Sequence, residues 1–238
     1  MVHSLHIETD DTYAITEVTS VISHQLKTPL SVIKSSLEVI LSGELGTMPQ
    51  EQTEYVVIAL DNTKRMIALV KDFLDASRID EGRFELHSER ADLKKTVEEV
   101  LRDLAPFIQA KLSKVSFEPA GDVPLLSFDA MKIRQVIDNL LYNAVRYNKG
   151  KSEIIVRLEK KENEVIFSCK DNGSGISTKD KDKIFKKFYR GKSAIKLATE
   201  GSGLGLYISK AIIEQSGGRI WFESEENKGS VFYFSLPL

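Results

Sequence analysis

Two long runs of apolar residues at helical spacing make up the first third of the chain. Between residues 11 and 41, and again from about 49 to 79, apolar side chains recur every three or four positions. About 30 residues at 1.5 Å each form a rod of roughly 45 Å. The segment between the runs, residues 42–49, is short and contains glycines and a proline. The pattern predicts a long antiparallel helical hairpin.

A hairpin of two helices is too thin to enclose a hydrophobic core. Pairing with a second copy would bury the apolar stripes in a four-helix bundle. We therefore expect a homodimer through the hairpin. Packing of the hairpin on the remainder of its own chain is the alternative.

Beyond residue 80 the pattern alternates between helices and strands. Helices are predicted over 92–112, 129–145 and 204–215. Strands are predicted at 83–86, 114–118, 125–128, 152–160, 165–169, 218–223 and 230–236. These elements predict an α/β sandwich, in which helices cover one face of a mostly antiparallel sheet. The whole chain is expected to be a multidomain α+β protein, divided into residues 1–86 and 87–238.

The composition is that of an ordinary globular protein of 238 residues. A net charge of −2 gives no electrostatic reason to expect nucleic acid as a partner. No apolar run approaches the roughly 20 residues of a membrane span, and the N-terminus does not have the layout of a signal peptide. The single cysteine suits a reducing compartment. We expect a cytoplasmic location, with membrane attachment only if the chain is part of a longer protein.

His24 lies beside the apolar stripe of the first predicted helix, between Ile22 and Leu26. Such a histidine is most simply an ordinary surface residue. Pro29, however, lacks a backbone donor and its ring crowds the carbonyl of Gln25, which would bend or loosen the helix beside His24.

A glycine-containing segment, DNGSGI at 171–176, directly follows a predicted strand. It is most simply a turn, because Asn-Gly is a common turn pair. It could also form the floor of a ligand site, where Gly173 and Gly175 admit a flat ring and Asp171 accepts a hydrogen bond from an exocyclic amine.

A second such segment, GSGLG at 201–205, precedes a predicted helix. Glycines there permit close approach, and the helix N-terminus offers N–H groups to an anion. It matches neither a Walker A loop nor a Rossmann turn.

Asn139 and Asn143 are four residues apart and therefore share one helix face. They could simply be solvated, or they could donate to a phosphate or offer a carbonyl oxygen to Mg²⁺. Arg146, one turn further on, could face a phosphate or could simply extend its charged end into solvent.

The segment 184–191 is aromatic and basic, and its simplest interpretation is a helix end packed by Phe185 and Phe188. The polar stretch at 192–200 is typical of a mobile lid over a ligand.

Five of these segments, in this order, resemble the motifs of sensor histidine kinases, and the resemblance covers about residues 11–238. SHQLKTPL (23–30) is similar to the phospho-acceptor box and QVIDNLLYNAVRY (135–147) to the N box. DNGSGI is similar to the first glycine box, IFKKFYRG (184–191) to the F box and GSGLGLYI (201–208) to the second glycine box.

The resemblance implies a dimerisation and phosphotransfer hairpin, residues 1–86, and a catalytic ATP-binding domain, residues 87–238, of the kind shared with gyrase, Hsp90 and MutL. His24 would attack the γ-phosphate of ATP and pass the phosphoryl group to an aspartate of a response regulator receiver domain. Thr28 would position water for the reverse, dephosphorylating reaction. A neutral imidazole is a competent nucleophile near neutral pH.

The resemblance also implies a nucleotide site. Asp171 would recognise the adenine amine, Tyr147 would border the base, and Arg190 would reach the γ-phosphate. Asn143 would ligate Mg²⁺ with support from Asn139. The other residues implied in binding the nucleotide are Arg146, Gly173, Gly175, Gly201, Gly203, Leu204 and Gly205.

The chain departs from the family pattern at two positions. Gln25 stands where the family usually has a glutamate that serves as a general base, and Arg146 stands where it often has lysine. Because Gln25 cannot take a proton, an alternative function is that of a kinase-impaired member that acts mainly as a response-regulator phosphatase. A dimeric scaffold that only binds nucleotide is a third possibility.

Overall fold

The computed structural model describes residues 7–121, 123–148, 152–197 and 201–238, and side chains from residue 25 onward except those of Ala120 and Lys196. The chain divides into two compact units, Met1–Phe84 and Glu85–Leu238. Among the described residues, no helix combines the length and apolarity that a membrane crossing requires.

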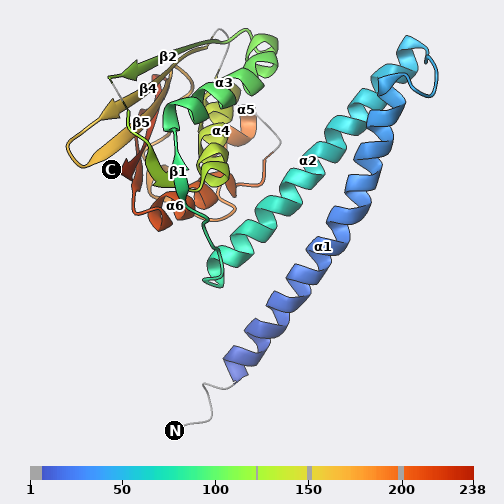
Figure 1. The fold of residues 1–238 in the computed structure, drawn as a ribbon, viewed down its shortest axis with the longest axis horizontal. Coiled ribbons are helices and arrows are strands. Elements are labelled where there is room, and N and C mark those ends of the chain that lie inside the picture. The colour runs from blue at the N-terminus through green and yellow to red at the C-terminus, as the bar shows by residue number, and fades with distance from the viewer. Residues whose placement is uncertain (1–6, 122, 149–151, 198–200) are drawn as a thin grey trace. The chain divides into compact units, whose positions relative to one another are not determined.

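The first unit is a hairpin of two long helices, α1 (Ile7–Ser42) and α2 (Gln50–Asp80), as Figure 1 shows. Helix α1 continues past Pro29. Two glycines in the connection, Gly43 and Gly46, have positive φ angles of 81° and 107°, which a side chain would disfavour. The predicted helical hairpin is confirmed.

Apolar side chains of both helices remain about half exposed in a single copy of the chain. Those between 45 % and 56 % exposed are Leu26, Ile33, Ile58, Met66, Leu69 and Phe73. Exposed apolar area on this scale favours burial against a partner surface. The expected homodimer stays a prediction.

The second unit contains a five-stranded sheet in the order β2-β4-β5-β7-β6. Its strands are β2 (Lys114–Ala120), β4 (Glu153–Lys160), β5 (Glu164–Asp171), β6 (Arg219–Glu225) and β7 (Gly229–Pro237). Strands β2 and β4 are parallel, and all other neighbours are antiparallel. A separate two-stranded sheet pairs β1 (Glu89–Ala91) with β3 (Leu126–Phe128).

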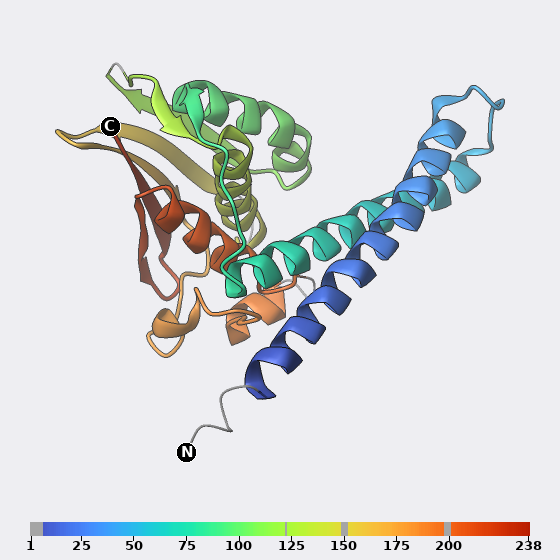
Figure 2. The ribbon, with the colours of Figure 1, turned by 60° about the horizontal axis from the view of Figure 1, so that its bottom comes forward.

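Helices α3 (Leu93–Ala110), α4 (Ala130–Arg146) and α6 (Gly205–Gln215) lie on one side of the five-stranded sheet (Figures 1 and 2). The carboxylates of Asp92 and Asp129 cap α3 and α4 by accepting from the N–H groups of Lys95 and Lys132. The covered face carries the core, in which the ring of Phe167 stacks on another phenylalanine 4.7 Å away. The predicted layering of helices over a mostly antiparallel sheet is confirmed.

Three local predictions were wrong. Residues 83–86 form no strand, and the strand lies instead at Glu89–Ala91, where it pairs with β3. The segment before this strand is held by the backbone N–H of His87, which donates to the Asp129 carboxylate at 2.9 Å. Residues 184–188 form turns after a short 3₁₀ helix (Lys181–Lys183) rather than a helix end. Phe185 packs edge-on against another ring at 6.0 Å, but Phe188 is 56 % exposed with a positive φ of 61°.

Pro119 belongs to β2, although it was expected in the following loop. Strand β2 is an edge strand that pairs only with β4 in the described sheet, so a residue without an N–H donor is tolerated there.

Candidate functional site

Four of the five motif segments meet within the second unit. The end of α4 contacts the segment after β5, where the N–H of Ser174 donates to the carbonyl of Tyr147 at 3.3 Å. Helix α4 is joined to α6 by a hydrogen bond of 3.0 Å between the side chains of Asn139 and Ser209. The segment 184–191 reaches the second glycine-rich loop, because Arg190 Nη1 donates to the carbonyl of Gly201 at 3.3 Å.

Asp171 is the last residue of β5 and is mostly buried. The N–H of Gly173 donates to its Oδ1 at 2.7 Å, and the Ser230 backbone also hydrogen-bonds to the carboxylate. Burial nevertheless raises the pKa of Asp171 from 3.8 to about 6, because removal from water penalises the charged form. At neutral pH the side chain is therefore a desolvated carboxylate, a strong acceptor for a ligand N–H group.

The glycines of the first glycine-rich loop are packed against protein backbone. A Cβ at Gly173 would lie 2.7 Å from Asp171 Oδ1 and 2.9 Å from the carbonyl oxygen of Tyr147. Gly175 has a φ of 62°, and its Cβ would lie 2.0 Å from the carbonyl oxygen of Glu225 at the end of β6. The sequence suggested room for a ligand here, whereas both glycines are required by the close contacts of this loop with α4 and β6.

The two amides of α4 form a hydrogen-bonded chain with α6. Asn143 Nδ2 donates to Asn139 Oδ1 at 3.3 Å, and Asn139 Nδ2 donates to the hydroxyl of Ser209 at 3.0 Å. This arrangement confirms that the two asparagines share a helix face. It also orients the carboxamide of Asn143 with its nitrogen toward Asn139. Sequence reasoning missed Ser209, which is only 2 % exposed and gives no distinctive motif signal.

The second glycine-rich loop leads directly into α6. Gly203, with a φ of 71°, lies so close to the Phe188 backbone that a Cβ would be 2.7 Å from its carbonyl carbon. A Cβ at Gly205 would lie 2.3 Å from Asn139 Oδ1. Leu204 is the N-cap residue of α6 and is buried, and its side chain cannot satisfy the helix N-terminus. The glycines thus bring the loop and the helix start close to both the 184–191 segment and α4.

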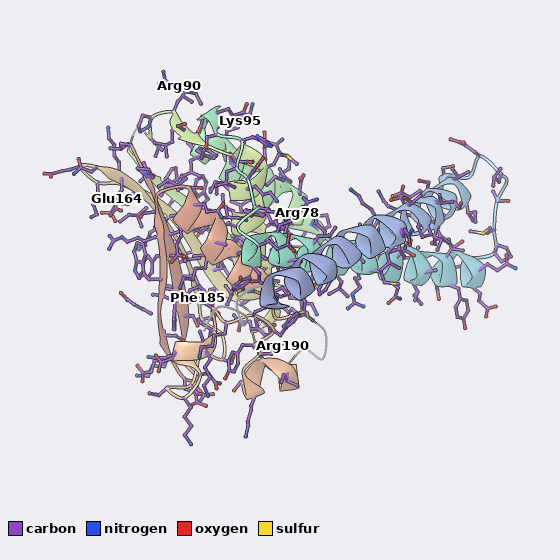
Figure 3. The ribbon with its side chains drawn as sticks, turned by 90° about the horizontal axis from the view of Figure 1, so that it is seen from below. Arg78, Arg90, Lys95, Glu164, Phe185 and Arg190 are labelled. Carbon is purple, nitrogen blue, oxygen red and sulfur yellow. The ribbon has the colours of Figure 1, made fainter. Side chains whose placement is uncertain are left out.

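Two guanidinium groups approach this loop. A Cβ at Gly201, where φ is 126°, would lie 3.6 Å from Arg146 Nη1 and 3.7 Å from Arg190 Cζ. Figure 3 labels Arg190 in the segment that precedes the short helix α5 (Lys192–Leu197). Two arginines beside a glycine-rich helix start are favourable for binding an anion such as phosphate.

The remaining predicted residues belong to the first unit. The backbone of His24 is part of α1, but its side chain lies outside the described part of the structure. Gln25 and Thr28 are exposed on the same helix. Of the expected lid at 192–200, residues 192–197 form α5 and 198–200 lie outside the described residues, so a lid stays a prediction.

Comparisons with known proteins identify relatives of both units. A family described as "His Kinase A (phospho-acceptor) domain" matches residues 14–82, and "Histidine kinase-, DNA gyrase B-, and HSP90-like ATPase" matches residues 128–238. Sensor protein SrrB of Staphylococcus aureus is 34 % identical over 230 residues, which cover 91 % of this chain and 37 % of SrrB. Sensor protein kinase WalK of the same organism is 33 % identical over 224 residues, which cover 91 % of this chain and 52 % of WalK.

A solved structure of histidine kinase ThkA in complex with response regulator protein TrrA is similar in fold, with a TM-score of 0.62 at 25 % identity. The match covers 93 % of this chain and 61 % of that chain. The chain spans about a third of SrrB and about half of WalK.

Proposed function

Because the chain belongs to the sensor histidine kinases, with a phospho-acceptor domain followed by an ATP-binding domain, we propose that it transfers the γ-phosphoryl group of ATP to His24 and then to an aspartate of a response regulator. The observation that carries this proposal is that α4 contacts both glycine-rich segments. Its end meets the loop after Asp171, and its Asn139 lies against the second glycine-rich loop, which Arg190 also contacts. We further propose that residues 1–86 provide dimerisation and phosphotransfer and residues 87–238 provide catalysis.

In the proposed nucleotide complex, Asp171 accepts a hydrogen bond from the adenine amine and Tyr147 borders the base. The N-terminus of α6, with Gly201, Gly203, Leu204 and Gly205, receives the phosphates. Arg146 and Arg190, whose guanidinium groups lie beside Gly201, neutralise phosphate charge. Gly173 and Gly175 support the site indirectly by allowing the loop after Asp171 to pack tightly.

The side chains on α4 fit a magnesium ion that is bound together with the nucleotide. Mg²⁺ prefers oxygen ligands and usually takes only one or two from the protein, the remainder coming from phosphates and water. Asn143 would supply its carboxamide oxygen, and Asn139 would orient it through the hydrogen bond of 3.3 Å. When bound, the ion would screen the charge of the phosphates.

In the proposed transfer, an imidazole nitrogen of His24 attacks the γ-phosphorus. A nitrogen–phosphorus bond forms, the bond to the bridging oxygen breaks, and ADP leaves. Gln25 can hydrogen-bond to the ring but cannot accept its proton, so the proton passes to water. We therefore expect autophosphorylation to be slower than in relatives with a carboxylate at this position.

The partners proposed are a second copy of this chain through the hairpin and the receiver domain of a response regulator. The half-exposed apolar side chains of α1 and α2 support the first, and the complex of the similar kinase ThkA with TrrA supports the second. Thr28, on the same helix as His24, would position water for the reverse reaction. We propose that the chain acts in the cytoplasm, as the cytoplasmic part of a longer sensor where it belongs to one.

Incubation with γ-labelled ATP and Mg²⁺ tests the proposal directly. The intact chain should acquire acid-labile label, and His24→Ala should acquire none. His87→Ala is a matched control, because His87 is an exposed histidine of the other unit, and it should be labelled normally. Label that persists in His24→Ala would contradict the assignment of His24. Nucleotide binding without label, together with faster loss of phosphate from a phosphorylated regulator, would instead indicate the phosphatase function.

A further inference from the structure

The guanidinium group of Arg146 lies near two aromatic rings. Its Cζ atom is 5.6 Å from the centre of the Tyr142 ring and 5.9 Å from that of Tyr147. Tyr142 in turn stacks on Phe107 of α3, with ring centres 4.7 Å apart and an angle of 13° between the planes. Contacts therefore run from Phe107 on α3 through Tyr142 to Arg146 on α4, and we call these three side chains the α3–α4 stack.

The far end of this stack is the second glycine-rich loop. Arg146 Nη1 lies 3.6 Å from the Cβ position of Gly201, and Arg190 approaches the same point. An arginine side chain has many rotamers, and holding one of them for a ligand costs conformational entropy. A ring beneath the guanidinium reduces that cost, because the favourable rotamer is already populated before the ligand arrives.

We propose that Tyr142, backed by Phe107, is a positioning residue that holds the Arg146 guanidinium ready for the phosphate chain of the nucleotide. Tyr142 acts through Arg146 and is not assigned a contact with the ligand. The proposal rests on the proposed function, because it assumes that the second glycine-rich loop receives phosphates. It specifies which part of the nucleotide is affected: the affinity for the phosphates, not that for adenosine.

The stack also gives a physical reason for arginine at position 146. A planar, delocalised guanidinium can lie over a ring and still direct N–H groups outward, whereas a lysine ammonium is a compact and strongly hydrated charge. Tyr142 and Arg146 are one helical turn apart on α4, so the helix itself places the ring and the cation together.

A purely structural role for Tyr142 predicts a different result from a positioning role. If the ring only packs α3 against α4, its loss would weaken all ligands equally or lower stability alone. If it positions Arg146, its loss would weaken only ligands that carry phosphates. The ratio of ATP affinity to adenosine affinity therefore separates the two roles.

The experiment measures displacement of a fluorescent ATP analogue from the full chain by adenosine, ADP and ATP. Tyr142→Leu should weaken ADP and ATP by about two- to fivefold, the range expected for losing one cation–ring contact, and leave adenosine unchanged. Tyr142→Phe, which keeps the ring, should behave like the parent chain. Tyr233→Leu is the matched control, because Tyr233 on β7 stacks on Trp221 of β6, with ring centres 5.2 Å apart, and is not part of the α3–α4 stack. This variant should change none of the three affinities.

A double-variant cycle completes the test. In an Arg146→Ala background, Tyr142→Leu should have little further effect on ATP, because the guanidinium group that the ring holds is already absent. Equal weakening of adenosine and ATP, or full additivity in the double variant, would overturn the proposal. Should Tyr142→Leu fail to fold, Phe107→Leu removes the backing ring and must reduce the same affinity ratio, by a smaller factor. Failure of the parent chain to bind any of the three ligands would instead count against the proposed function.

Discussion

Replacing Asp171 by asparagine should remove a dependence of the second unit's stability on pH, together with the proposed adenine contact. Burial raises the pKa of Asp171 from 3.8 to about 6, so the folded state binds its proton more tightly than the unfolded state. Ionising the carboxyl group therefore costs stability. The cost is absent well below pH 3.8, grows as the pH rises, and is complete above about pH 6.

The pKa shift sets the magnitude of this cost. At 1.36 kcal/mol for each pKa unit, the full cost of ionisation is about 3 kcal/mol. About 2 kcal/mol of it develops between roughly pH 4.5 and pH 7.5. In Asp171→Asn the side-chain oxygen can still accept from the N–H of Gly173, but the amide nitrogen replaces the acceptor that faces Ser230. That loss does not depend on pH, so it shifts the whole stability curve without changing its slope.

Urea denaturation at a series of pH values measures the free energy of unfolding of the second unit, in which Asp171 lies. Trp221 is the only tryptophan in the sequence and lies on β6, stacked on Tyr233 at 5.2 Å, so its emission follows the unfolding of the second unit. The free energy of unfolding of the variant minus that of the parent chain should rise by about 2 kcal/mol between roughly pH 4.5 and pH 7.5. Parallel curves for the two proteins would refute the reasoning, because they would mean that Asp171 has an ordinary pKa. Calorimetric titration at neutral pH should show that the variant has lost nucleotide affinity.

Three further changes have defined expected outcomes. Gln25→Glu supplies a proton acceptor beside His24 and should raise the rate of phosphohistidine formation, an effect that is typically 10²- to 10⁴-fold for a well-placed base; an unchanged or lower rate in a labelling time course would contradict this. Ser209→Ala removes the hydroxyl that holds Asn139 and should reduce the affinity for ATP by about threefold when Mg²⁺ is present. The reduction should be smaller when a chelator removes the metal; equal reductions under the two conditions would exclude a link to the metal. Gly205→Ala places a Cβ 2.3 Å from Asn139 Oδ1 and should destabilise the second unit by about 1–3 kcal/mol. Urea denaturation followed by tryptophan emission measures this loss, and an unchanged urea midpoint would show that α4 and α6 can separate without cost.

Periodicity predicted the helical hairpin well because a spacing of three to four persists over about 30 residues in each helix. Short elements were less predictable. Phe84 and Leu86 alternate with polar neighbours as a strand would, yet the strand begins at Glu89, because its position depends on pairing with Phe128, distant in sequence. The parallel pairing of β2 with β4 has the same origin, since no local signal specifies which strand lies beside which.

The candidate site was predictable in its residue types but not in its contacts. The motifs identified Asp171 and Asn143, whereas Ser209 and Tyr142 were missed because serine and tyrosine inside a helix give no distinctive spacing. Their contributions become visible only when α6 and α3 are placed against α4. Gly175 was assigned to a ligand, although the room beside it is taken by the carbonyl of Glu225.

The order of strands in the large sheet has a consequence for biosynthesis. Strand β7 comes last among the strands of the chain, yet it is inserted between β5 and β6, with Asp171 opposite Ser230. While a ribosome is still adding residues 229–237, β5 lacks its neighbour on that side and the loop after Asp171 lacks the hairpin that ties it down. The second unit must therefore complete its folding only after this strand has emerged from the exit tunnel, and a chain cut short before β7 should be left with an open strand edge, prone to aggregation and unable to form the Asp171 environment.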